Sequence, residues 1–135
     1  MRKNEPIATI MSTELVTAHV GQKLSEVRAL LSQGHIHHIP VLSGERLVGL
    51  ISSADILKAG YGGSDSEIDS TLDFTAKLED VMQNNPTTIS AQSTVRDAAE
   101  ILAEGSFHCL PVVKDEKLVG IVTTTDLLRY LVAQY

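Results

Sequence analysis

Two short segments of the chain carry an apolar run, hydroxyl side chains and an acid in the same order. They are residues 47–55 (LVGLISSAD) and residues 118–126 (LVGIVTTTD). A carboxylate accepts strong charge-assisted hydrogen bonds, including two from vicinal hydroxyls. Backbone N–H groups and the dipole at a helix N-terminus favour a phosphate. The candidate contacts to such a ligand are therefore the two acids and the hydroxyls three positions before them, Asp55, Asp126, Ser52 and Thr123.

The same residues also have a purely structural interpretation. An acid in the first turn of a helix is stabilising by about 0.3–1 kcal/mol without any ligand. Serine and threonine are ordinary helix caps, and we expect Ser53 and Thr124 to take that role. Taken alone, each motif favours capping, and a second copy at a fixed distance shifts the balance towards binding.

A gapless repeat relates the two halves of the chain. Asp55 and Asp126 lie 71 positions apart (126 − 55), and the same shift superposes many other identities. The matched pairs include Met11 with Met82, Thr17 with Thr88, Leu31 with Leu102, Gly34 with Gly105, His37 with His108, and Pro40 with Pro111. A period of this size exceeds that of solenoid repeats, so we expect two similar units and no array.

Composition limits the classes of function. The chain has 135 residues, of which 43% are hydrophobic, and a formal net charge of −6. An acidic chain without a basic patch is a poor candidate for nucleic-acid binding. We find neither an apolar run long enough to span a membrane nor a signal region, so we expect a cytoplasmic protein. The single cysteine, Cys109, has no partner for an internal disulfide.

Hydrophobic periodicity predicts the order β-α-β-β-α in each half. Thr94 and Asp97 are spaced as a capping box, and Gly34 and Gly105 are placed to end helices. The predicted helices are 24–33, 53–59, 94–104 and 124–133, preceded by short helical turns at 6–12 and 77–82. The predicted strands are 15–17, 38–42, 46–52, 109–113 and 118–123. The Gly-, Ser- and Asp-rich stretch 60–73 is predicted to be a mobile acidic linker without an enzymatic role.

Two copies of h-P-V followed by G-h-h-[ST]-x-x-D resemble a CBS domain pair, also called a Bateman module. The resemblance implies an α+β fold, a tandem pair of β-α-β-β-α repeats with pseudo-twofold symmetry. It divides the chain into repeat 1 (1–60), a flexible acidic linker (61–76) and repeat 2 (77–135). It also implies a homodimer and an adenosine-containing ligand bound between the repeats.

In this family, the repeat opposite the ribose-binding acid supplies part of the base pocket. By that resemblance, Ile10, Ile36 and His37 would flank a base held by Asp126. Val81, Phe107 and His108 would flank a base held by Asp55. Thr125 adds a hydroxyl where the first motif has Ala54, so we predict that the Asp126 cleft is the better site.

The histidines and two cations are further phosphate candidates. Family members often carry basic residues near His37 and His108, although both can equally be surface histidines. Lys58 and Arg129 follow the two acids by about one helical turn, where solvated charges are also common. A zinc site is an alternative, but alternation along a strand directs His37 and His38 to opposite faces, so we predict no metal.

The sequence contains no nucleotide-binding loop and no recognisable catalytic arrangement. We therefore predict a non-catalytic sensor, without a required cofactor, that binds AMP, ADP or ATP and acts through an unidentified regulated protein. Two alternatives stay open. One is a ligand-free dimerisation or docking module, and the other is a binder of S-adenosylmethionine or NAD.

Overall fold

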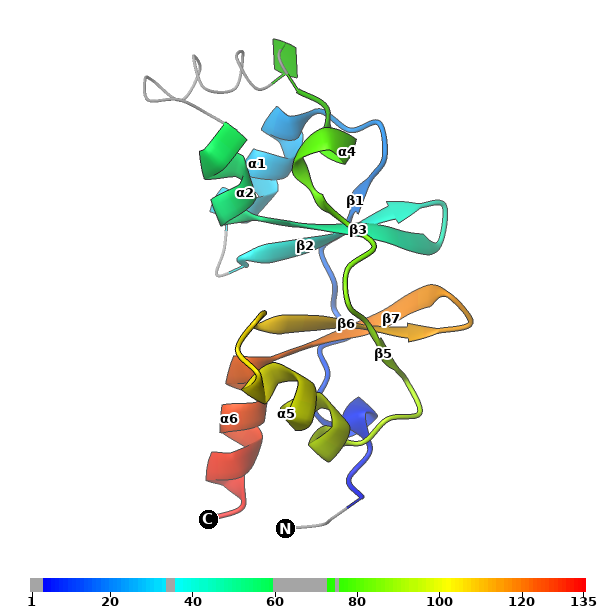
Figure 1. Cartoon of the computed structure of the whole chain (residues 1–135), viewed down its shortest axis with the longest axis vertical. Coiled ribbons are helices and arrows are strands. Elements are labelled where there is room, and N and C mark those ends of the chain that lie inside the picture. Colours follow the sequence, from blue (N-terminus) through cyan, green and yellow to red (C-terminus); the bar gives the residue numbers. More distant parts are fainter. Residues whose placement is uncertain (1–3, 34–35, 60–72, 75) are drawn as a thin grey trace. The chain divides into compact units, whose positions relative to one another are not determined.

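The computed structural model describes residues 4–33, 36–59, 73–74 and 76–135 (Figure 1). The elements of the first repeat are η1 (Ile7–Thr9), β1 (Ala18–His19), α1 (Leu24–Ser32), β2 (His38–Ser43), β3 (Arg46–Ser52) and α2 (Ser53–Ala59). Those of the second are α4 (Leu78–Val81), β4 (Gln83–Asn84), β5 (Ile89–Ser90), α5 (Val95–Ala103), β6 (Cys109–Lys114), β7 (Lys117–Thr123) and α6 (Thr124–Ala133). The predicted α+β class and the order β-α-β-β-α are confirmed.

The chain packs into two compact units that exchange the opening segments of the repeats. The central unit comprises residues 16–86, and the terminal unit comprises residues 1–15 and 87–135. Helix η1 therefore packs with the strands of the second repeat, whereas α4 packs with those of the first. The repeat boundaries stay a prediction, because a packing unit and a sequence repeat need not coincide.

The central unit is built on a hairpin with one strand added at each edge. Strands β2 and β3 are antiparallel, with Ile39 opposite Ile51, while β1 pairs with β2 in parallel and β4 pairs with β3 antiparallel. Helix α1 forms because its apolar residues recur at helical spacing, and Leu24, Val27 and Leu31 are buried against the hairpin. The rest of this core is Ala18, Ile39, Val41, Ile51, Ile56, Leu78 and Met82.

The terminal unit repeats this plan. Strands β6 and β7 form the hairpin, with Leu110 opposite Val122, and β5 pairs with β6 in parallel. The opening segment joins the unit through reciprocal backbone hydrogen bonds between Ser12 and Ile121, of 2.8 and 3.0 Å. The core consists of Ile7, Ile89, Ala98, Leu102, Leu110, Val112 and Val122.

Local signals in the second repeat are confirmed. Thr94 accepts a hydrogen bond from the Asp97 backbone N–H, and the Asp97 carboxylate accepts one from the Thr94 N–H, which is the predicted capping box. Gly105 has a φ of +81°, the left-handed conformation that ends a helix at glycine. The equivalent Gly34 and nearly all of the predicted linker lie outside the described residues.

The prediction of a strand at 15–17 is wrong. The strand is β1, Ala18–His19, because Ala18 pairs with Val41 and its side chain is fully buried. Val16 packs against the same core without joining the sheet. Apolar character therefore located the packing but not the backbone pairing.

Candidate functional site

The N-terminus of α6 brings the second motif together. Thr123 is the N-cap, and its Oγ1 accepts a hydrogen bond of 3.1 Å from the Asp126 backbone N–H. In return, the Thr123 backbone N–H donates to Asp126 Oδ2 at 2.8 Å. Thr124 follows as the first helical residue, and its N–H donates to the His108 carbonyl at 3.0 Å. The strand end, the helix start and His108 are therefore fixed against one another.

The N-terminus of α2 repeats this geometry with the first motif. The Asp55 N–H donates to Ser52 Oγ at 3.2 Å, and the Ser52 N–H donates to Asp55 Oδ2 at 2.9 Å. The Ser53 N–H donates to the His37 carbonyl at 3.2 Å. The motif builds the same reciprocal pair of bonds in both units.

The predicted helix caps are corrected by one position. Ser53 and Thr124 were expected to cap, yet Ser52 and Thr123 carry the capping oxygens. A capping side chain reaches the N–H three residues ahead, and the acids at 55 and 126 stand three residues after 52 and 123. Each motif therefore forms a helix cap, as its structural interpretation expects.

Capping leaves part of each carboxylate available. Both hydrogen bonds from the backbone go to Oδ2, and within the described ranges Oδ1 of Asp55 and Asp126 has no hydrogen-bond partner. Both acids are half-buried. A capping box therefore orients each carboxylate with one oxygen fixed and the other able to accept a hydrogen bond from a ligand.

The predicted base-pocket residues are distributed over both units. In the terminal unit Ile10 and Phe107 pack at the margin of the core, and His108 is exposed. In the central unit Ile36 and Val81 pack at the margin, and His37 is exposed. Each predicted pocket draws residues from both units, so their assembly around one base stays a prediction.

The polar candidates on the helices are open to solvent. Lys58 on α2 and Arg129 on α6 are both exposed, one helical turn beyond the acids. Thr125 is exposed in the first turn of α6, and Ala54 occupies the matching exposed position in α2. The extra hydroxyl of the second motif thus stands on an accessible surface.

Cys109 is a neighbour of the site that sequence reasoning missed. It pairs with Thr123 across the β6–β7 hairpin, and its side chain is 3% exposed. Burial, with a smaller contribution from the Asp126 carboxylate, raises the pKa of the thiol to about 11. The pairing of β6 with β7 reveals this neighbour, because it sets Cys109 opposite the capping hydroxyl of Thr123. The thiol is protonated at neutral pH and therefore a poor nucleophile.

The Cys109 pKa predicts a loss of stability in alkali. Between about pH 9 and 11 the unfolded thiol ionises while the folded thiol keeps its proton, so the free energy of unfolding falls as pH rises. Denaturant unfolding at pH 8, 9, 10 and 11 measures this slope. We expect Cys109→Ala to have a shallower slope than the parent protein. Equal slopes for the two proteins would contradict the assignment.

Two further observations bear on function. In the described parts of the chain, no three His, Cys, Asp or Glu side chains are grouped so that they could hold a metal ion. Among the same residues, no helix combines the length and the hydropathy needed to cross a lipid bilayer.

These features define a class of protein, a tandem α+β repeat with a capped acid after each hairpin. The family model of the CBS domain matches residues 7–62 and again residues 78–133. The chain therefore belongs to the CBS domain family, as a tandem pair.

Known proteins similar to this chain include an enzyme and two ligand complexes. The A-adding tRNA nucleotidyltransferase of Geobacter sulfurreducens is 27% identical over 92% of this chain. The matched region makes up 13% of the length of that enzyme. The crystal structure of CBSX2 in complex with AMP is 26% identical, with a TM-score of 0.81 over 96% of this chain and 98% of that one. The CBS domain pair of protein MJ0100 in complex with 5′-methylthioadenosine and S-adenosyl-L-methionine is 27% identical, with a TM-score of 0.80 over 98% of this chain and 99% of that one.

Proposed function

We propose that this chain is a non-catalytic regulatory module that binds an adenine nucleotide and transmits its occupancy to a partner protein. A ligand of this kind acts through different affinities for two states of the protein. AMP, ADP and ATP are the proposed ligands, since the hydroxyls of both motifs stand at helix N-termini, which favour phosphate.

The observation that carries the proposal is the geometry of the two acids. Asp55 and Asp126 are each oriented by a reciprocal capping box through Oδ2. The second oxygen keeps its capacity to accept hydrogen bonds from ribose hydroxyls. A capping role alone accounts for one oxygen, whereas the CBS-pair complex with AMP supports a ligand role for the other.

A competing ligand class is supported by a specific relative. The MJ0100 domain pair is described in complex with 5′-methylthioadenosine and S-adenosyl-L-methionine, which share adenosine with AMP but lack phosphate. The ribose-binding acids would serve both classes. The phosphate distinguishes them, because Thr125 and Arg129 offer polar contacts to a phosphate, whereas 5′-methylthioadenosine has a neutral thioether in its place and S-adenosyl-L-methionine a cationic sulfonium.

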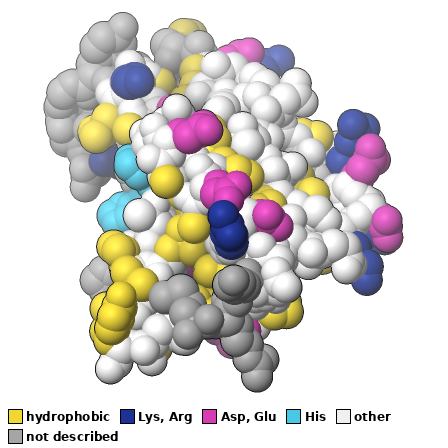
Figure 2. All heavy atoms as spheres, turned by 60° about the horizontal axis from the view of Figure 1, so that its bottom comes forward, with side chains coloured by type: hydrophobic (Ala, Val, Ile, Leu, Met, Phe, Trp, Pro, Cys, Tyr) yellow, Lys and Arg dark blue, Asp and Glu magenta, His cyan; other side chains and the backbone are white. Residues whose placement is uncertain are grey.

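An apolar surface on α6 supports the proposed homodimer. None of the residues of α6 is buried within the chain, and its exposed apolar residues are Leu128 at 57%, Leu131 at 40% and Val132 at 73%. Tyr135, two residues beyond the end of the helix, is 98% exposed. Hydrophobic side chains are visible on the face turned forward in Figure 2, which carries this end of the chain. A second copy that covers these side chains would remove them from water.

Calorimetric titration with AMP, ADP, ATP, S-adenosylmethionine and NAD tests the proposal. We expect micromolar affinity for at least one adenine nucleotide and weaker binding of S-adenosylmethionine. Preference for S-adenosylmethionine would replace the nucleotide assignment with the competing class. Absence of heat and of any thermal stabilisation by all five compounds would identify a ligand-free docking module instead.

A further inference from the structure

The two units provide hydrogen-bond acceptors for the N-terminus of their first long helix in different ways. Helix α5 of the terminal unit is capped locally by Thr94 and Asp97. The equivalent N-cap of α1 is Lys23, which has the extended backbone of a cap (φ −73°, ψ 143°) but makes no side-chain capping hydrogen bond. The first turn of α1 must therefore find acceptors elsewhere.

Asp73 supplies the missing acceptor. It lies near the end of the inter-repeat segment, the stretch 61–76 predicted as a linker. Its Oδ1 accepts a hydrogen bond of 3.0 Å from the Ser25 backbone N–H, and its Oδ2 accepts one of 2.6 Å from Ser25 Oγ. The two residues are 48 positions apart. A carboxylate at this place satisfies an orphan N–H and is favoured by the helix dipole.

Glu79, in the first turn of α4, makes a contact with the residues that precede α1. Its Oε1 accepts a hydrogen bond of 2.8 Å from the backbone N–H of Gly21, which lies in the connection between β1 and α1. At the equivalent place in the terminal unit, the Gln92 N–H donates to Ser90 Oγ, only two residues away. In the terminal unit both places use acceptors from nearby residues. In the central unit the acceptors are Asp73 and Glu79, which are distant along the chain.

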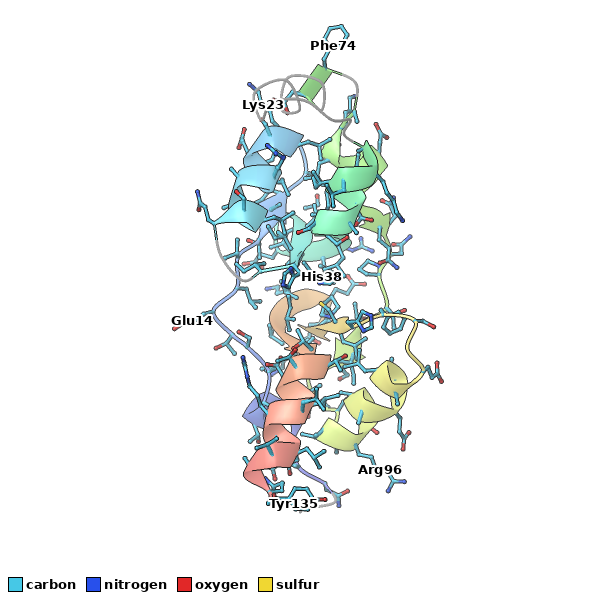
Figure 3. The ribbon with its side chains drawn as sticks, turned by 90° about the vertical axis from the view of Figure 1, so that its left-hand side faces the viewer. Glu14, Lys23, His38, Phe74, Arg96 and Tyr135 are labelled. Carbon is cyan, nitrogen blue, oxygen red and sulfur yellow. The ribbon has the colours of Figure 1, made fainter. Side chains whose placement is uncertain are left out.

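Within the described residues, the contacts that hold Asp73 against α1 are polar. The adjacent Phe74 is 91% exposed. In Figure 3, Phe74 projects outward at the end of the central unit where Lys23 also lies. Within the described residues, the two hydrogen bonds to Ser25 therefore set the cost of releasing Asp73.

We propose that Asp73 is the N-terminal cap of α1, supplied from 48 positions further along the chain, and that it acts as a latch between the end of the inter-repeat segment and α1. Helix α1 ends at Ser32, shortly before Ile36 and His37. Fraying of a nine-residue helix loosens the residues that follow it, because helix formation is cooperative. The latch thereby couples the inter-repeat segment to the base pocket, and this second step rests on the proposed function.

Hydrogen exchange of the ligand-free protein tests the cap without reference to any ligand. In Asp73→Ala we expect the amides of the first turn of α1 to exchange about fivefold faster, the effect of losing one helix cap. Lys23→Thr recreates the Thr-x-x-acid spacing of α5 with Glu26 and should restore part of the protection. Asp80→Ala is the matched control, because Asp80 is an exposed acid of the nearby helix α4 without a side-chain hydrogen bond to the described residues.

The outcomes separate the latch from the proposed function. Unchanged exchange in Asp73→Ala, or an equal increase in Asp80→Ala, would overturn the cap. Faster exchange with an unaltered affinity for AMP would overturn the coupling and leave the cap intact. If the parent protein binds none of AMP, ADP and ATP while the exchange result holds, the proposed function fails and the cap by Asp73 stands.

Discussion

Asp126→Ala is expected to weaken the binding of an adenine nucleotide by about tenfold to a hundredfold. Hydrogen bonds to a charged group contribute about 1.5–3 kcal/mol, and each 1.4 kcal/mol is a factor of ten in affinity. Asp55→Ala should have a smaller effect on the tighter binding step, because the first motif lacks the hydroxyl that Thr125 adds. Calorimetric titration of both variants measures the two affinities.

Loss of the helix cap must be separated from loss of the ligand contact. Removal of the Asp126 carboxylate also breaks the capping box of α6, which stabilises the protein by about 1 kcal/mol. Asp97→Ala is the matched control, since Asp97 makes the same box with Thr94 at the start of α5. The Thr94 backbone N–H holds the pKa of Asp97 below its usual value, as expected for a carboxylate engaged in a cap.

The control predicts a clear contrast. Asp97→Ala should lose a similar amount of stability in denaturant unfolding and keep the affinity of the parent protein for nucleotide. Asp126→Ala should lose both. A parallel loss of affinity in the two variants would assign the effect to helix stability and remove Asp126 from the ligand site. Equal affinities at the two clefts would contradict the predicted advantage of the Asp126 cleft.

Local signals allowed the hairpins, the long helices and the α5 capping box to be predicted from the sequence. Each depends on residues within a few positions of one another, and the 71-residue shift gave the hairpins and the long helices a second copy, although not the capping box, which has Lys23 in place of Thr94. The acids of the motif were also identified correctly as first-turn residues. Their capping partners were misplaced by one position, because consecutive hydroxyls offer two possible caps to a reader of the sequence.

Long-range packing accounts for what the sequence did not reveal. Nothing local indicates that Met11 packs on the strand of the second repeat, or that Asp73 caps a helix 48 residues earlier. Cys109 is also informative only once β6 and β7 are paired, because the pairing sets it opposite Thr123. These contacts join residues whose separation along the chain carries no periodic signal.

The exchange of opening segments explains the glycine in each Leu-Val-Gly sequence. A Cβ on Gly120 would lie 2.7 Å from Met11 Sδ and 3.1 Å from the Ser12 carbonyl oxygen. A Cβ on Gly49 would meet the side chain of Met82, with Cε at 2.9 Å. Neither glycine has a positive φ, so the requirement for glycine comes from space and not from backbone conformation.

Gly120→Ala is therefore expected to destabilise the protein by about 1–3 kcal/mol, the usual cost of overpacking a core. This cost exceeds the gain of about 0.4–1 kcal/mol that alanine brings by restricting the unfolded chain. Gly49→Ala should cost less, because all three of its nearest neighbours belong to the Met82 side chain, which can change rotamer. Denaturant unfolding of the two variants gives both values.

Double variants identify the neighbour responsible for each cost. Met82→Ala should abolish the cost of Gly49→Ala, since the truncated side chain leaves room for the new methyl group. Met11→Ala should relieve Gly120→Ala only in part, because the Ser12 carbonyl oxygen is backbone and is held by the hydrogen bond that it accepts from the Ile121 N–H. Complete rescue at Gly120 would show that the backbone at Ser12 moves to make room for the new methyl group. Equal costs of Gly49→Ala and Gly120→Ala would show that the Met82 side chain does not change rotamer. The pattern of partial and complete rescue thus tests whether each repeat packs its opening methionine on the glycine of the other.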